Sequence, residues 1–218
     1  MSSNATALLE RFAVFGRFYD ARIGGEMRSL RSHLEIVDRQ ASVKLPWQRD
    51  ADLVAIMMNP GASRPVGPGD IDGWATAQPD RTQYQLMKLA LRAQADGWAL
   101  RHIRVINLSD LRTPKSAELF KSLATMANGS HSIFNSTRCA ELAQSLGGVR
   151  VPVLRAWGLA RQLDGLARLA VAATPSRTVY GLTNNGFQYR HPLPQRADFQ
   201  QQWLDQMELQ LMSSRRAH

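Results

Sequence analysis

Polar residues that could do chemistry directly follow apolar runs at four places in the chain. Residues 54–58 form an uninterrupted apolar run, which stops at the "NPG" of residues 59–61. A second run ends at Asn107, a third ends at the "WG" of residues 157–158, and a fourth is followed by a loop that contains His191. An amide side chain offers both a hydrogen-bond donor and an acceptor, and a neutral imidazole can donate from one ring nitrogen while the other accepts. These residues are therefore the first candidates for a site.

The elements that must position these residues alternate between strand and helix from residue 52 onward. The apolar runs predict strands over 52–59, 102–109, 151–158 and 177–183, and helical spacing predicts helices that include 81–97 and 197–212. Such alternation implies parallel strands joined by right-handed crossovers, and continuous apolar runs fit a sheet that is covered on both faces. We therefore expect an α/β fold of three layers, α/β/α, around a central four-stranded parallel sheet. Ligands bind beyond the carboxyl ends of parallel strands, so the four polar segments should meet at one edge.

The first 50 residues have a different pattern. "FAVFGRFY" (12–19) and "HLEIVD" (33–38) look like the two strands of a hairpin in a segment that is rich in arginine, Arg31 included. We interpret residues 1–50 as a β-rich extension packed on a core domain of residues 51–218, the whole forming one compact unit. The arginines of this segment either contact phosphates or belong to a solvated surface.

Composition and charge restrict the classes of partner. The chain has 218 residues with 27 Lys and Arg against 18 Asp and Glu, a net charge of +9. Such a surface attracts polyanions, of which nucleic acid is the commonest, although solvated arginines alone would give the same charge. With a single cysteine, Cys139, the chain can build neither an internal disulfide framework nor a cysteine-rich zinc or iron–sulfur site.

No other cofactor or membrane signal stands out. The five histidines show no paired metal-ligand spacing, so we expect no metal and no cofactor. The sequence contains no apolar run of membrane-spanning length and no signal-peptide pattern at its start. We therefore expect a cytoplasmic protein without a membrane partner, and a monomer.

The four polar segments resemble, in order and in strand placement, the motifs of the uracil-DNA glycosylase superfamily. "MMNPG" is similar to the "GINPG" of its mismatch-specific thymine/uracil branch, "VINLSDLRT" to "LLNTVLT", "LRAWGLARQL" to "LLWGSYAQ", and "RHPLPQ" to "HPSPLS". The resemblance spans residues 52–195 and implies a uracil-DNA glycosylase-like fold. The same pattern also resembles a family of short bacterial domains that has no assigned function.

The resemblance implies a monofunctional DNA glycosylase, which hydrolyses the N-glycosidic bond of a nucleotide rotated out of the stack and leaves an abasic site. Asn59 would hold the attacking water through its side-chain oxygen, and His191 would donate to the base oxygen where charge builds. Asn107 would pair with the edge of a pyrimidine. Each residue also has a plain structural interpretation: Asn59 as a turn cap, His191 as an ordinary loop histidine, and Asn107 as a strand-end amide that satisfies backbone groups.

The loops around these residues would contact DNA. The predicted DNA contacts are Pro60, Ser63, Arg190, Pro192, Leu193 and Pro194. Rigid loops of small residues let backbone N–H groups approach phosphates, and Leu193 between two prolines would wedge into the vacated stack. The uracil-specific branch has a tyrosine where this chain has Gly61. We interpret Gly61 as leaving the C5 side of the base pocket open. An open C5 side favours a larger pyrimidine, such as the glucosylated 5-hydroxymethylcytosine of a phage.

Three tryptophan and tyrosine residues and one lysine also bear on the predicted site. Trp74 and Tyr84 are the candidates for the aromatic side chain that stacks on the base, whereas we expect Trp157 in the core. Lys115 looks like a helix-start residue, so a lyase mechanism through a Schiff base is disfavoured. Two other functions stay open: a non-catalytic nucleic-acid-binding protein, and an enzyme that acts on a nucleotide or another small phosphorylated ligand. Base-excision repair and antiviral defence would both fit a glycosylase.

Overall fold

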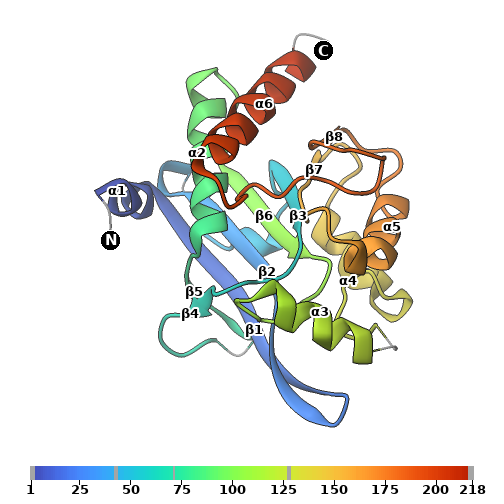
Figure 1. The fold of residues 1–218 in the computed structure, drawn as a ribbon. Coiled ribbons are helices and arrows are strands. Elements are labelled where there is room, and N and C mark those ends of the chain that lie inside the picture. The colour runs from blue at the N-terminus through green and yellow to red at the C-terminus, as the bar shows by residue number, and fades with distance from the viewer. Residues whose placement is uncertain (1–2, 42–43, 71, 127–128, 216–218) are drawn as a thin grey trace.

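A computed structural model describes residues 3–41, 44–70, 72–126 and 129–215. Its strands form one eight-stranded sheet in the order β4-β5-β1-β2-β6-β3-β7-β8 (Figure 1). The strands are β1 (Phe12–Ile23), β2 (Glu26–Asp38), β3 (Leu53–Met57), β4 (Arg64–Pro65), β5 (Trp74–Gln78), β6 (His102–Asn107), β7 (Val153–Arg155) and β8 (Val179–Tyr180). The α-helices are α1 (Ser3–Arg11), α2 (Arg81–Ala95), α3 (Ser116–Thr125), α4 (Cys139–Leu146), α5 (Asp164–Ala172) and α6 (Ala197–Arg215).

The α/β class is confirmed, but the sheet is mixed and twice as wide as the four-stranded parallel sheet that we expected. β6, β3, β7 and β8 pair in parallel. The N-terminal hairpin continues the same sheet, because β2 pairs antiparallel with β6 and β1 pairs antiparallel with β2 and β5. The hairpin is thus hydrogen-bonded to the parallel strand β6 and lies within the sheet, between β5 and β6.

Polar residues on β2 explain why the hairpin looked peripheral. Its alternating pattern of apolar and polar side chains is typical of a strand with one solvated face. In the structure every residue of β2 from Leu30 to Asp38 is buried. Glu35 is accommodated there because it pairs with His102 and Arg104 of the neighbouring strand β6. Ion pairs between the two strands therefore stabilise the carboxylate of Glu35, although the alternating pattern predicts that it faces solvent.

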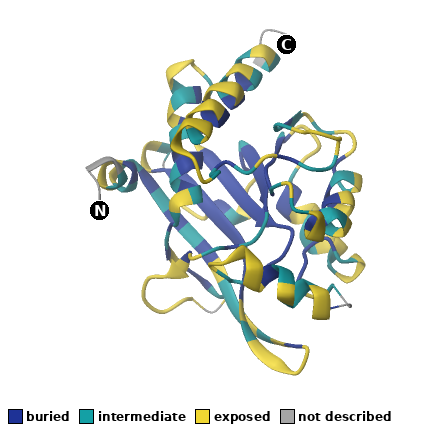
Figure 2. Cartoon of the chain, viewed as in Figure 1, coloured by how far each residue is buried: buried dark blue, intermediate teal, exposed yellow. Residues whose placement is uncertain are grey.

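Helices cover both faces of the sheet. All five residues of β3 are buried, and alternate ones point to opposite faces. Leu53, Ala55 and Met57 pack in one core with α1, α2 and α6, and Val54 and Ile56 pack in a second core with α4 and α5. Figure 2 shows the buried strands between helices whose outer faces are exposed. Trp157 is fully buried in the second core, as expected.

Residues 60–80, a polar stretch rich in proline and glycine, contain a short hairpin. β4 pairs antiparallel with β5, and β5 in turn pairs with β1. Proline and glycine on both sides conceal the five-residue strand "WATAQ" in the sequence. The segment ends at Asp80, which caps α2 in a capping box with Gln83. Within the described ranges, no helix is long and apolar enough to cross a membrane.

Candidate active site

A cavity of about 270 Å³ opens beyond the carboxyl ends of β3 and β6. These strands are parallel neighbours in which Met57 pairs with Asn107, so the residues that follow them emerge side by side. The lining includes the backbone of Gly61 and the residues Arg31, Asn59, Asp80, Asn107, His191 and Leu193. Three of the four polar segments, those of Asn59, Asn107 and His191, thus meet at this cavity with the start of α2 and with Arg31 of the N-terminal hairpin. The fourth, residues 157–158, does not line it, and Gly158 lines a second cavity instead.

Asn59 directs its amide nitrogen into the loop that follows β6. Nδ2 donates to the carbonyl of Thr113 at 2.8 Å and to that of Leu111 at 3.2 Å. A carbonyl can only accept, so the nitrogen must be the atom that faces this loop. Oδ1 has no donor among the described residues. Asn59 therefore presents a fixed, unused acceptor, the atom that a bound water needs.

Asn107 is fully buried at the end of β6, and both of its side-chain polar atoms are unpaired. Its exposure is 0%, and neither Nδ2 nor Oδ1 has a hydrogen-bond partner in the part of the chain that the structure describes. An unpaired buried polar group costs about 1–3 kcal/mol. The plain interpretation, that Asn107 satisfies backbone groups, does not fit this geometry. The amide instead offers a donor and an acceptor to whatever enters the cavity.

His191 is held by its own loop. Its Nδ1 lies 3.1 Å from the backbone nitrogen of Leu193 and accepts that hydrogen bond. A neutral ring that accepts at Nδ1 carries its proton on Nε2. Burial lowers the pKa of His191, and the nearby Asp80 opposes this shift. His191 therefore stays neutral near pH 7 and provides an N–H donor.

Gly61 has a local reason to be glycine. Its φ is +63°, in the left-handed region, and a Cβ built there would collide with Oδ2 of Asp80. The direction in which a side chain would point is thus filled by a carboxylate. Gly61 consequently does not open the cavity on that side, contrary to our interpretation from the sequence.

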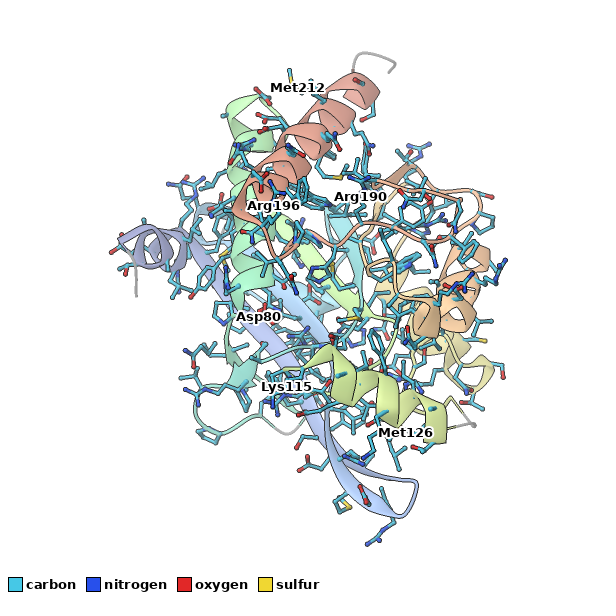
Figure 3. The ribbon with its side chains drawn as sticks, in the orientation of Figure 1. Asp80, Lys115, Met126, Arg190, Arg196 and Met212 are labelled. Atoms are coloured by element: carbon cyan, nitrogen blue, oxygen red, sulfur yellow. The ribbon has the colours of Figure 1, made fainter. Side chains whose placement is uncertain are left out.

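Asp80 and Arg31 are the site residues that the sequence analysis missed. Figure 3 shows Asp80 at the N-terminal end of α2. Its Oδ1 accepts from the backbone N–H groups of Thr82 and Gln83, while Oδ2 lies over Gly61. The Asp-x-x-Gln capping box indicates the helix start, but nothing in it shows that the second oxygen lies over Gly61 in a residue that lines a cavity. Arg31 is 0% exposed and so belongs to neither interpretation given above for the N-terminal arginines.

The two aromatic candidates lie outside this cavity. Trp74 is buried in β5 and stacks on Trp47, with ring centroids 4.5 Å apart. Tyr84 packs partly buried against the core around α2. Neither side chain lines the cavity, so the structure gives neither one a place to stack on a base there.

The predicted DNA contacts divide into two groups. Leu193 is half-buried and lines the cavity, so it does not stand free as a wedge. Arg190 and Pro194 line a second cavity of about 420 Å³, which shares His191 with the first. Arg190 is exposed on the loop that precedes α6 (Figure 3).

The other three predicted contacts, Pro60, Ser63 and Pro192, are buried. Buried side chains cannot reach a phosphate directly, so only backbone groups of these residues remain as possible contacts.

The described residues form no metal site, and comparisons with known proteins give no relative. Among the described residues, no three His, Cys, Asp or Glu side chains gather as a metal site. No family model, no curated protein and no solved structure matches the chain. We therefore infer a function from the geometry of the cavity.

Proposed function

We propose that the chain is a DNA glycosylase that hydrolyses the N-glycosidic bond of an everted pyrimidine nucleotide and leaves an abasic site. The observation that carries this proposal is Asn107, a fully buried amide with an unpaired donor and acceptor. It lines the same cavity as Asn59 and His191. A pyrimidine edge presents the complementary donor and acceptor, O4 and N3 of uracil or N4 and N3 of cytosine.

The three side chains match the three needs of the reaction. When the C1′–N bond breaks, its electron pair leaves with the base and the sugar becomes an oxocarbenium ion, to which water adds. Asn59 supports this step with an acceptor for the water, and His191 with an N–H donor for the oxygen of the departing base. Asn107 fixes the base so that the bond lies between these two groups.

A polyanionic substrate agrees with the charge of the chain. The net charge is +9, and exposed Arg81 and Arg190 lie at the first and second cavities respectively. Such groups attract the phosphate backbone without reading its sequence. We propose DNA as the partner on this basis.

The test is base release from defined oligonucleotides. Single- and double-stranded DNAs would carry uracil, thymine opposite guanine, 5-hydroxymethylcytosine or its glucosylated form, and alkali would reveal abasic sites. We expect wild-type protein to release at least one base, and Asn59→Ala and His191→Ala to lose release while they keep DNA affinity. Lys115→Gln is the matched control, since Lys115 is exposed and does not line the cavity.

Two results would contradict the proposal. One is the absence of abasic sites in every DNA, and the other is undiminished release by both variants. Tight binding of mononucleotides that depends little on salt would instead indicate an enzyme for small phosphorylated ligands.

A further inference from the structure

Arg31 is a buried cation whose hydrogen-bonding edge is open. Arg31 is one of the residues that line the cavity, and its Nη1 makes a long hydrogen bond of 3.4 Å to the carbonyl of Pro60. Nε and Nη2 have no partner among the residues that the structure describes. Burial lowers the pKa of Arg31 to about 10, with Asp80 and Asp110 opposing, so the group is still charged at pH 7.

The two open groups form one edge of the guanidinium. Nε–H and Nη2–H point the same way and bind two adjacent acceptors together. Removing a cation from water without pairing it is unfavourable, so the open edge is a defect in the free protein. A ligand with a carbonyl oxygen next to a ring nitrogen would remove this defect.

Asp80 supplies the opposite charge at the same cavity. It is the one carboxylate among the described lining residues. Among the described residues its Oδ1 accepts the capping hydrogen bonds, whereas its Oδ2 accepts none and Asp80 makes no ion pair with Arg31, whose Nη1 donates to Pro60. The cavity is thus bordered by a cation and an anion that do not neutralise each other directly.

We propose that Arg31 and Asp80 form an open charge pair that the dissociating substrate fills, an inference that rests on the proposed glycosylase function. As the C1′–N bond breaks, the base takes the electron pair and the sugar becomes positive. Arg31 donates to the carbonyl oxygen and adjacent nitrogen of the departing base. Asp80 faces the sugar cation and accepts a proton from the water that adds to C1′, a step that the amide of Asn59 cannot perform. That proton then passes to the base anion, which restores both side chains.

Three conservative variants separate charge from geometry. Arg31→Met removes the charge at similar length, Arg31→Lys keeps a charge without the two-donor edge, and Asp80→Asn keeps a helix-capping side chain without the charge. Single-turnover rates would be measured on whichever modified-base oligonucleotide the wild type cleaves. We expect Arg31→Met to lower the rate about 10²–10³-fold and Asp80→Asn about 10²-fold, with the DNA dissociation constant unchanged. Arg31→Lys should recover part of the rate.

The melting temperature and the DNA affinity of Arg31→Met test whether Arg31 has a structural or a phosphate-binding role instead. The inference predicts a melting temperature for Arg31→Met equal to or above that of wild type, because an unpaired buried charge is removed. A lower melting temperature together with the rate loss would show a structural role and overturn the inference. Weaker DNA binding with a smaller salt dependence would show a phosphate contact and also overturn it.

The rates separate this inference from the proposed function. If both Arg31→Met and Asp80→Asn cleave at the wild-type rate, the charge pair is wrong but the glycosylase stands. If wild-type protein releases no base from any oligonucleotide, the proposed function and this inference fail together.

Discussion

Arg31 and Arg104 are both buried in the same sheet, on the adjacent strands β2 and β6, but their surroundings differ completely. Arg104 donates through Nε to Glu35 at 2.7 Å and through Nη2 to the carbonyls of Pro46 and Arg49. The second oxygen of Glu35 lies 2.6 Å from Nε2 of His102. We call the three side chains Glu35, His102 and Arg104 the paired cluster. Arg31, in contrast, has one long hydrogen bond and an open edge.

The contrast is between buried polar groups that are hydrogen-bonded within the protein and buried polar groups that have no partner in it. In the described chain, Arg31 and Asn107 are the side chains with two unpartnered buried polar atoms, and each other such side chain has one. Both line the cavity, whereas the paired cluster does not. Unpaired buried groups lower stability, so the presence at one cavity of the two side chains with two such atoms each supports a functional role for them.

The largest expected effect is the loss of the paired cluster. Arg104→Met leaves the charge of Glu35 with His102 alone, and removing one partner of a buried ion pair costs about 3–5 kcal/mol. Urea unfolding should therefore show a much lower free energy of unfolding for Arg104→Met, while Arg31→Met stays within about 1 kcal/mol of wild type. Equal destabilisation by the two substitutions would remove the distinction between the two regions.

The pH dependence of the free energy of unfolding tests the structural role of the region around the paired cluster. His33 lies beside the paired cluster, and burial lowers its pKa to about 4, against 6.5 in the unfolded chain. A depressed folded-state pKa stabilises the protein above pH 6.5, and this contribution of about 3 kcal/mol is lost as pH falls toward 4. Wild type should lose more stability over this window than His33→Gln. Parallel pH profiles for the two proteins would contradict this assignment.

A smaller effect is expected at Gly61. Gly61→Ala places a side chain at a φ of +63° and displaces Asp80, which should cost about 1–2 kcal/mol of stability. Base release should fall by more than stability alone explains, because Asp80 borders the cavity. Thermal unfolding and the cleavage rate, measured on the same protein, check both parts. A variant with normal stability and normal cleavage would show that the position is not constrained.

Trp74 should have the smallest effect on chemistry. It stacks on Trp47 outside the cavity, so Trp74→Phe should leave the cleavage rate within about twofold of wild type while changing stability slightly. A hundredfold loss of cleavage without loss of stability would return Trp74 to the base-binding site.

The sequence predicted the polar residues that follow the strands, but it did not predict the residues whose place in the site depends on contacts with other segments. The residues after β3 and β6 could be placed at one edge because apolar runs identify strands and parallel strands share an edge. Arg31 could not be identified, since its position on β2 matches that of a solvated face and its burial depends on the loop after β3. From the sequence, Asp80 is recognisable only as a helix cap. Its place at the cavity depends on the contact of its second oxygen with Gly61, nineteen positions earlier in the chain.

The most direct test of the central claim is base release by wild type and Asn107→Leu, measured together with their melting temperatures. Leucine has nearly the shape of asparagine but no polar atom, so the substitution removes two unpaired groups from the interior. We predict a melting temperature equal to or above that of wild type and a loss of abasic-site formation of about 10²-fold or more. Undiminished release by Asn107→Leu, or a loss that merely follows a lower melting temperature, would contradict the claim that this amide is kept unpaired for a ligand.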